Sequence, residues 1–134
     1  MTFREVPRKR PVAALGPTMT AALYRSGRGQ SFRLLLGRDL LNQLAWDDRV
    51  RARLLFGDGR DRGRARLQRT GSGGSRLMRP VRNRPDSGCL VFSTQRLPDG
   101  VTTRPHSAVP VAHELAVDGI EFQVPDWFYA GARL

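Results

Sequence analysis

The chain has 134 residues, 40% of them hydrophobic, and carries 23 lysines and arginines against 12 aspartates and glutamates, a net charge of +11. This length indicates one small domain with attachments. The single cysteine, Cys89, excludes an intrachain disulfide and therefore a disulfide-stapled secreted fold. No stretch is long and apolar enough to cross a bilayer, so we expect a cytoplasmic protein with no membrane partner.

The positive charge lies in the first part of the chain. Residues 1–85 hold 20 Lys and Arg against 6 Asp and Glu, a net +14, whereas residues 86–134 hold 3 against 6, a net −3. Such an asymmetry indicates a front part that binds a polyanion and a more ordinary back part. Nucleic acid is the polyanion that this charge favours most.

The first two predicted elements precede any clear periodicity. Residues 1–30 mix proline, glycine, arginine and small residues, which predicts a flexible basic arm with at most a short turn around 19–24. Ser31 to Leu36 predicts a short strand, which begins a core region that we extend over residues 31–70.

A short helix is predicted from Arg38 to Leu44. Leu40, Leu41 and Leu44 share one helical face. Asp39 lies in the first turn, where the helix dipole favours a negative charge. The aspartates that follow at 47 and 48 are expected to end the element after about two turns.

An arginine-rich β-hairpin is predicted next. Arg49–Leu54 and Arg62–Leu67 alternate arginine with apolar or small residues, and Gly57–Asp61 between them has the composition of a turn. Successive side chains of a strand point to opposite faces, so this pattern gives one guanidinium face and one apolar face. The alternative is a helix that continues from Arg38 through Phe56, in which the alternation would be accidental and Asp48 would interrupt the apolar stripe.

Residues 71–85 are predicted to be a Gly/Ser/Arg-rich linker or a loop that joins two strands. The run Thr70–Ser75 is rich in glycine and serine, but no Gly-Lys-Ser/Thr ending follows it, so it is a poor candidate for a phosphate-binding loop.

Residues 86–134 are predicted to form a C-terminal β segment. Cys89–Phe92 has the composition of a buried strand, and two apolar runs flank Asp118-Gly119, a strong signal for a β-hairpin. Pro110 places its strand at a sheet edge. We interpret Trp127–Tyr129 as a hydrophobic anchor onto the core or a partner subunit, with base stacking as the alternative.

The segment Leu34–Trp46, followed by Asp47–Leu54, resembles the AbrB/SpoVT swapped-hairpin domain. That family's pattern runs from a hydrophobic strand through Ile-Pro-x-x-(Leu/Ile)-(Arg/x)-x-x-Leu-Gly-Ile and Gly-Asp into a β-hairpin. Leu40 and Leu44 match its helix anchors and Trp46 matches the hydrophobic residue after the helix. The sequence departs from the pattern at three places, with Gly37 in place of proline, Ala45 in place of glycine and Asp47-Asp48 in place of Gly-Asp. In addition, Leu41 and Asn42 stand where some members of the family carry arginines that contact DNA.

The resemblance covers about a third of the chain and implies a fold and an assembly. The expected fold is mainly β, a β-rich α+β fold with a small swapped-hairpin-like barrel, one short helix and a C-terminal β-hairpin. The resemblance also implies an intertwined homodimer, because in that family the hairpins of two chains interleave to complete one barrel. Residues 110–125 would be a degenerate second hairpin of the same kind, although no copy of the helix anchors precedes them.

Catalytic and metal-binding patterns are absent from the sequence. His106 and His113 have no cysteine or second histidine at ligand spacing, and no nucleophile or metalloprotease motif occurs. Cys89 has the setting of a small buried hydrophobic residue. We therefore expect no enzyme activity, no cofactor, no metal and no small-molecule substrate.

The sequence thus predicts a dimeric DNA-binding protein, a transcriptional regulator of bacterial or phage type, with binding that is regulatory or independent of sequence. One alternative is an RNA-binding or ribosome-associated protein, which would favour aromatic residues on the basic face. Another is a phage structural or adaptor protein that docks through its acidic second half. The predicted nucleic-acid-binding residues are Arg33, Arg38, Arg49, Arg51, Arg53, Arg60, Arg62, Arg64 and Arg66.

Overall fold

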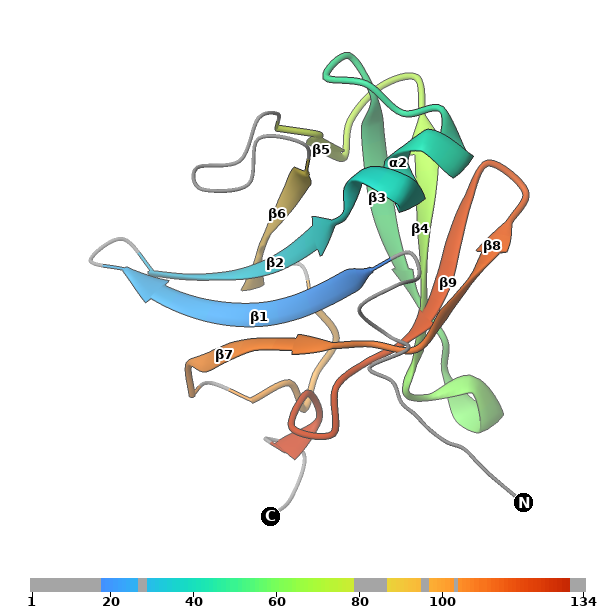
Figure 1. Cartoon of the computed structure of the whole chain (residues 1–134). Coiled ribbons are helices and arrows are strands. Elements are labelled where there is room, and N and C mark those ends of the chain that lie inside the picture. The colour runs from blue at the N-terminus through green and yellow to red at the C-terminus, as the bar shows by residue number, and fades with distance from the viewer. Residues whose placement is uncertain (1–17, 27–28, 79–86, 95–96, 103, 131–134) are drawn as a thin grey trace, which may run out of the picture.

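The structure is a computed structural model that describes residues 18–26, 29–78, 87–94, 97–102 and 104–130 (Figure 1). Two antiparallel sheets form, sheet A in the order β6-β2-β1-β7 and sheet B in the order β5-β3-β4-β9-β8. The elements are β1 (Met19–Ser26), β2 (Gly29–Leu36), α2 (Arg38–Leu44), β3 (Arg51–Phe56), the 3-10 turn η1 (Gly59–Asp61), β4 (Arg64–Thr70), β5 (Ser75–Arg76), β6 (Gly88–Ser93), β7 (His106–Pro110), β8 (His113–Ala116) and β9 (Gly119–Gln123). The mainly β class is confirmed, but the sheets do not close into the small barrel that we expected.

Both sheets and the helix contribute to one hydrophobic core. Sheet A buries Met19 and residues 21–23 of β1 and alternate residues of β2, sheet B buries Ala52, Ala65 and Leu67, and α2 adds Leu40 and Leu41. The C-terminal segment shares this core through residues of β6, β9 and the end of the described chain: Leu90, Ile120, Phe122 and Phe128. Residues 31–70 and 86–134 are therefore parts of one packed unit.

The basic arm predicted over residues 1–30 is wrong for residues 19–26 and 29–30. Residues 19–26 form β1, which pairs along its whole length with β2 and on its other side with β7. Met19, Ala21 and Leu23 are buried because they face the core at the period of two that a strand imposes. The remainder of the predicted arm, residues 1–17, lies outside the described residues.

The arginine-rich hairpin is confirmed, and the alternative of one long helix is wrong. The strand β3 pairs antiparallel with β4 from Arg51 opposite Thr70 to Phe56 opposite Ala65. The predicted turn region contains η1. The helix α2 ends at Leu44 because Ala45 takes a left-handed conformation, with φ 57° and ψ 41°. Ala45 thus has a conformation that glycine adopts more easily than alanine.

A second hairpin, β8–β9, pairs with the first through β9 and β4. In sheet A, β2 also pairs antiparallel with β6, and β7 lies between β6 and the second hairpin in the sequence. The second half of the chain thus contributes the two edge strands of sheet A, β6 and β7, and then a hairpin in sheet B, but it does not repeat the pairing of β1 with β2. The place beside β4 in sheet B is filled by β9 of the same chain.

Gly119 lies outside the turn of the β8–β9 hairpin, although the pair Asp118-Gly119 was the signal that predicted this hairpin. Ala116 pairs with Gly119, so the turn residues are Val117 and Asp118, and Asp118 has a positive φ of 56°. Gly119 is the first residue of β9, and a Cβ there would lie 2.0 Å from the carbonyl oxygen of Leu67. Glycine is therefore needed here for the close approach of β9 to β4.

Candidate nucleic-acid interface

The outer face of sheet B carries the arginines that the alternation placed there. Arg51 and Arg53 of β3 and Arg64 and Arg66 of β4 are exposed, while the residues between them turn toward the core. The predicted separation into a guanidinium face and an apolar face is confirmed for this hairpin. Phe56 lies on the apolar side, with its ring stacked on that of Phe128 and the two ring centres 5.5 Å apart.

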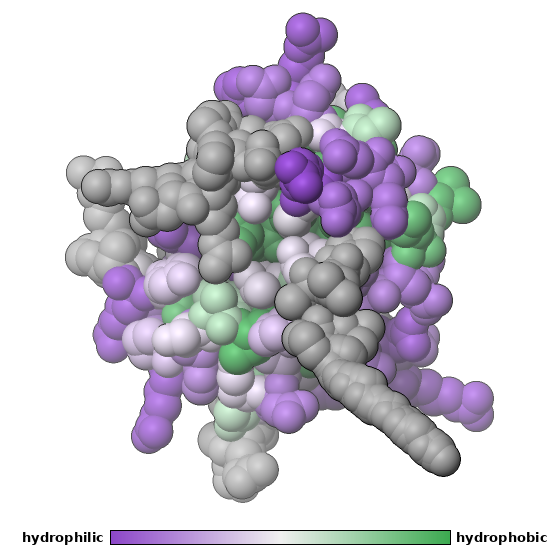
Figure 2. Space-filling view, in the orientation of Figure 1, coloured by the Kyte–Doolittle hydropathy of each residue, from purple (hydrophilic) through white to green (hydrophobic). Residues whose placement is uncertain are grey.

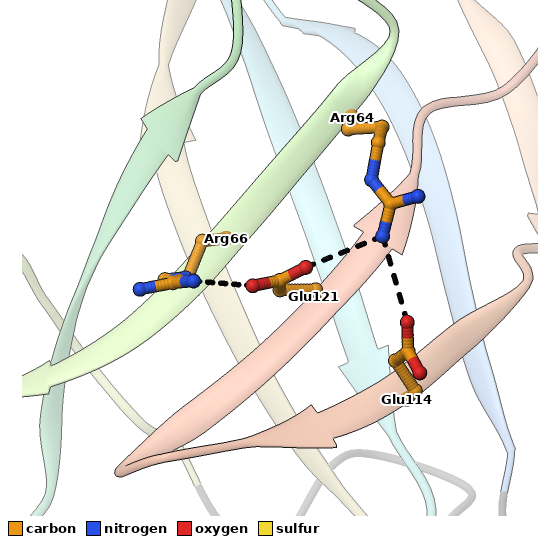
Figure 3. A network of polar contacts seen from close by, with 4 residues as sticks. All are labelled: Arg64, Arg66, Glu114 and Glu121. Carbon is orange, nitrogen blue, oxygen red and sulfur yellow. Dashed lines mark hydrogen bonds and ion pairs between the residues drawn. The ribbon is translucent and has the colours of Figure 1, made fainter. Parts of the chain in front are cut away.

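Two of these arginines are paired with carboxylates of the second hairpin (Figure 3). Glu121 of β9 accepts hydrogen bonds from Arg66 and, at 3.2 Å, from Arg64. Arg64 also lies 3.5 Å from a carboxylate oxygen of Glu114 in β8. The guanidinium face predicted for the hairpin is therefore not purely basic, because the pairing of β4 with β9 brings two glutamates beside the arginines.

The hydrogen bond from Arg66 and the positive charges of Arg66 and Arg64 lower the pKa of Glu121 below its ordinary value. The carboxylate therefore stays ionised to a lower pH than a free glutamate, and this half of the face carries little net charge. The middle of the arginine face is better suited to holding β4 to β9 than to holding a phosphate.

A cluster of arginines without ion pairs in the described part of the chain lies instead at the end of the β3–β4 hairpin remote from η1, which we call the open end. Arg49, Arg51 and Arg69 line a hollow of about 440 Å³ there, together with the start of the loop after β4 and Asp118. No ion pair to Arg49, Arg51 or Arg69 occurs within the described residues. Figure 2 shows hydrophilic residues over α2 and this end of the hairpin, at the top of the view.

The glycine-rich loop from Gly71 to Gly74 borders this hollow. The guanidinium of Arg51 donates to the carbonyl oxygen of Gly73 at 2.8 Å, which fixes the arginine against the loop. Gly74 has φ 66° and lies against the carbonyl of Ala52, so a side chain at that position has no room. The predicted linker is therefore, over residues 71–78, an ordered loop followed by β5 and a bridge from Met78 to Cys89; residues 79–86 lie outside the described chain.

The other predicted arginines lie on different parts of the surface. Arg33 belongs to sheet A, with its guanidinium 4.8 Å from the ring centre of Tyr24, and Arg38 opens α2 beside Asp39. Arg60 lies in η1, and the guanidinium of Arg62 lies 3.9 Å from the ring centre of Tyr129. The structure thus does not gather all nine predicted residues into one surface.

Two arginines were missed by the sequence prediction. Arg69 falls on the apolar parity of β4, after Ala65 and Leu67, yet it is exposed because it lies near the end of the strand. Arg76 falls in the predicted linker and lies in β5, where its Nε donates to the carbonyl oxygen of Asp48 at 3.0 Å. In the sequence, the glycine-rich run between Arg69 and Arg76 was the only indication that the chain turns back toward β3 at this point.

The remaining residues that the sequence singled out, a cysteine, the aromatic residues near the C-terminus and a histidine, take part in packing. Burial raises the pKa of the Cys89 thiol, and the charge of Arg33 acts in the opposite direction. Phe128 is fully buried against Phe32 and Phe56, which confirms the predicted anchor onto the core. The ring of His106 stacks on that of Trp127 at 4.3 Å.

Within the described ranges, no helix is long and apolar enough to span a membrane. Comparisons with protein-family models, with curated proteins and with solved structures gave no match to this chain.

Proposed function

We propose that this protein binds duplex DNA through the open end of the β3–β4 hairpin and acts as a regulator of transcription. The observation that carries the proposal is the hollow lined by Arg49, Arg51 and Arg69 beside the loop that starts at Gly71. Guanidinium groups donate hydrogen bonds in pairs to phosphate oxygens, which makes arginine the preferred side chain for such a site. The resemblance of residues 31–70 to the AbrB/SpoVT domain supports the regulatory role.

Duplex DNA is favoured over single-stranded nucleic acid because the described part of the surface that carries the exposed arginines offers no aromatic ring on which a base could stack. Proteins that hold single-stranded nucleic acid place aromatic side chains on the binding surface. On the outer face of sheet B the described residues include no aromatic side chain, since Phe56 packs against Phe128. The surface therefore suits contacts to the phosphate backbone, which fix the position of a protein on a duplex.

The test is a binding titration with a short labelled duplex, the matching single strand and an RNA of the same sequence. In the full chain, Arg49→Gln with Arg69→Gln removes two charges from the hollow and keeps polar side chains of similar length. We expect the affinity for the duplex to fall and the slope of log K against log salt to shrink by about two units.

The control variant is Arg25→Gln with Arg104→Gln, which removes the same charge from exposed positions of β1 and of the chain between β6 and β7. An equal loss of affinity in the control would mean that net charge alone drives binding, and the proposed interface would be rejected. Tighter binding of RNA than of duplex DNA would reject the preference for DNA.

A further inference from the structure

A second hollow lies on the other side of the glycine-rich loop, between β3 and β6. This groove has a volume of about 730 Å³. Its apolar lining includes the half-buried side chains of Phe56, Phe92 and Leu97, which pack against the core. Arg53 and Arg76 line it as well, and none of the described lining residues is acidic.

One wall of the groove is an unpaired strand edge. β5 pairs with β3 only at Arg51 and Ala52, so the rest of β3 has no neighbour on that side within the described chain. The N–H of Gly57 donates to the carbonyl of Arg64 in β4. Because hydrogen bonding alternates along an antiparallel strand, Leu54 and Phe56 direct their N–H and C=O groups away from β4, into the groove.

These backbone groups have no hydrogen-bond partner in the groove among the described residues. An open edge of this kind is a template for another strand, because it offers donors and acceptors at the spacing of a sheet. A nucleic-acid backbone would use the donors and leave the carbonyl groups of Leu54 and Phe56 unsatisfied, since phosphate oxygens only accept hydrogen bonds. The edge therefore fits a polypeptide.

The side chains around the edge define which polypeptide fits. A strand added beside β3 would extend sheet B, so its inward side chains would face Phe56 and Leu97, while its outward ones would lie beside Arg53. Arg53 is exposed and has no ion pair among the described residues. Apolar residues suit the first set of positions and acidic residues the second.

We propose that this groove binds an extended peptide of a partner protein, with alternating acidic and apolar residues, as an added strand along the edge of β3 at Leu54 and Phe56. The two ligands would then lie on opposite sides of the loop Gly71–Gly74, with DNA against Arg49 and Arg69 and the peptide against Arg53. The peptide proposal does not depend on DNA binding. The groove and the hollow at the open end share no lining residue, and only the loop Gly71–Gly74 borders both.

The probe is the blocked peptide Ac-Glu-Val-Glu-Val-Glu-Val-NH2, added to the ¹⁵N-labelled full chain and followed by amide NMR signals and hydrogen exchange. We expect the amide signals of Leu54 and Phe56 to shift and their exchange to slow, because both N–H groups gain acceptors. The same peptide with lysine in place of glutamate should bind more weakly. Unchanged signals at Leu54 and Phe56 with the acidic peptide, or larger shifts there with duplex DNA, would overturn the proposal.

A charge swap gives the sharper result. Arg53→Glu should weaken the acidic peptide by on the order of tenfold and strengthen the lysine peptide, since an attraction becomes a repulsion. Arg60→Glu, on the exposed turn η1, makes the same charge change away from the groove and should alter neither peptide by more than about twofold. Equal effects of the two substitutions would show that the peptide responds to net charge only and would reject the site.

The two proposals fail separately. Arg49→Gln with Arg69→Gln should abolish most duplex binding and leave the acidic peptide bound at Leu54 and Phe56. Loss of peptide binding in that variant, with the fold intact by NMR, would show that both ligands share one basic surface and would overturn the separate groove.

Discussion

Arg66 and Glu121 lie directly opposite one another on β4 and β9, and the guanidinium of Arg66 donates a hydrogen bond to the carboxylate of Glu121. The two residues are 55 positions apart in the sequence. The pair therefore joins the arginine-rich hairpin to the C-terminal hairpin and neutralises part of the face that the sequence presents as basic.

The first prediction concerns the pH dependence of this pair. The folded-state pKa of Glu121 is lowered below the ordinary value of a glutamate, so the contribution of its charge to stability is present above that ordinary value and is lost as the pH falls through the folded-state pKa. Glu121→Gln should therefore lower the free energy of unfolding at neutral pH and lower it less near pH 3. Urea unfolding of both proteins at the two pH values measures the difference.

Glu114→Gln is the matched control for Glu121→Gln. The side chain of Glu114 is 72% exposed and approaches only Arg64, at 3.5 Å, so its removal should cost less at every pH. A destabilisation by Glu121→Gln that is the same at both pH values would mean that the lost packing of the side chain, and not its charge, is responsible.

The second prediction concerns the end of α2. Ala45 has φ 57°, a conformation that costs residues with a Cβ roughly 1 kcal/mol, while its N–H donates to the carbonyl of Asn42. Ala45→Gly should therefore stabilise the protein by about 0.5–1 kcal/mol, although the greater freedom of glycine in the unfolded chain offsets part of the gain. Thermal unfolding gives the sign, and a lower melting temperature for the variant would contradict the left-handed assignment.

The third prediction uses two glycines in different settings. A Cβ at Gly119 would lie 2.0 Å from the carbonyl oxygen of Leu67, whereas a Cβ at Gly71 would meet nothing within 4 Å. Gly119→Ala should force β9 away from β4 and cost several kcal/mol, on the order of 3. Gly71→Ala should change the stability by less than about 0.5 kcal/mol. Similar melting temperatures for the two variants would show that β9 does not approach β4 as closely as described.

Local patterns in the sequence were sufficient for the elements whose periodicity is strong. The alternation of arginine with apolar residues predicted β3 and β4, and three leucines predicted α2, because each pattern fits a single period. β1 was missed because Thr20 and the two alanines after it give a weak contrast between its faces. The alternation is visible in Met19, Ala21 and Leu23 once the pairing with β2 is known.

The candidate site was harder to predict because it depends on pairing between distant strands. Nothing near Arg64 or Arg66 in the sequence indicates that Glu121 will lie beside them, since the register of β4 against β9 is set by the whole fold. Arg69 was not among the predicted residues, and its exposure on the side of Ala65 and Leu67 follows from its place near the end of β4. Periodicity predicts which face of a sheet a residue lies on, but it does not predict where along the strand that face is no longer covered by other residues.

The fourth prediction concerns the core and the assembly. Leu40 and Leu41 are each 1% exposed, whereas Leu44 is only half-buried. Leu40→Ala should cost about 2–5 kcal/mol, and Leu44→Ala should cost less. The resemblance predicts an interleaved dimer, but β9 already occupies the place beside β4, so we expect one chain to fold alone.

The assembly is tested by the concentration dependence of unfolding. For a fold completed within one chain, the melting temperature stays constant as the protein concentration rises, whereas an obligate dimer melts higher at higher concentration. Sedimentation of the wild-type chain and of Leu40→Ala gives the mass in solution. A dimer that dissociates only on unfolding would support the interleaved assembly that the sequence predicted.

The last prediction changes the charge of the proposed DNA-binding hollow in the opposite direction from the removal of an arginine. Asp118 lines the hollow with Arg49 and Arg69, and its carboxylate repels a phosphate there. Its φ of 56° suits asparagine as well as aspartate, so Asp118→Asn should keep the turn and remove one negative charge. The affinity for duplex DNA should therefore rise, by on the order of threefold to tenfold at low salt, with the gain fading as salt screens the charge. Asp58→Asn, at the exposed far end of the hairpin before η1, is the matched control and should leave the affinity nearly unchanged. If both substitutions raise the affinity equally, the DNA responds to the total charge of the protein and the open end of the hairpin is not its binding site.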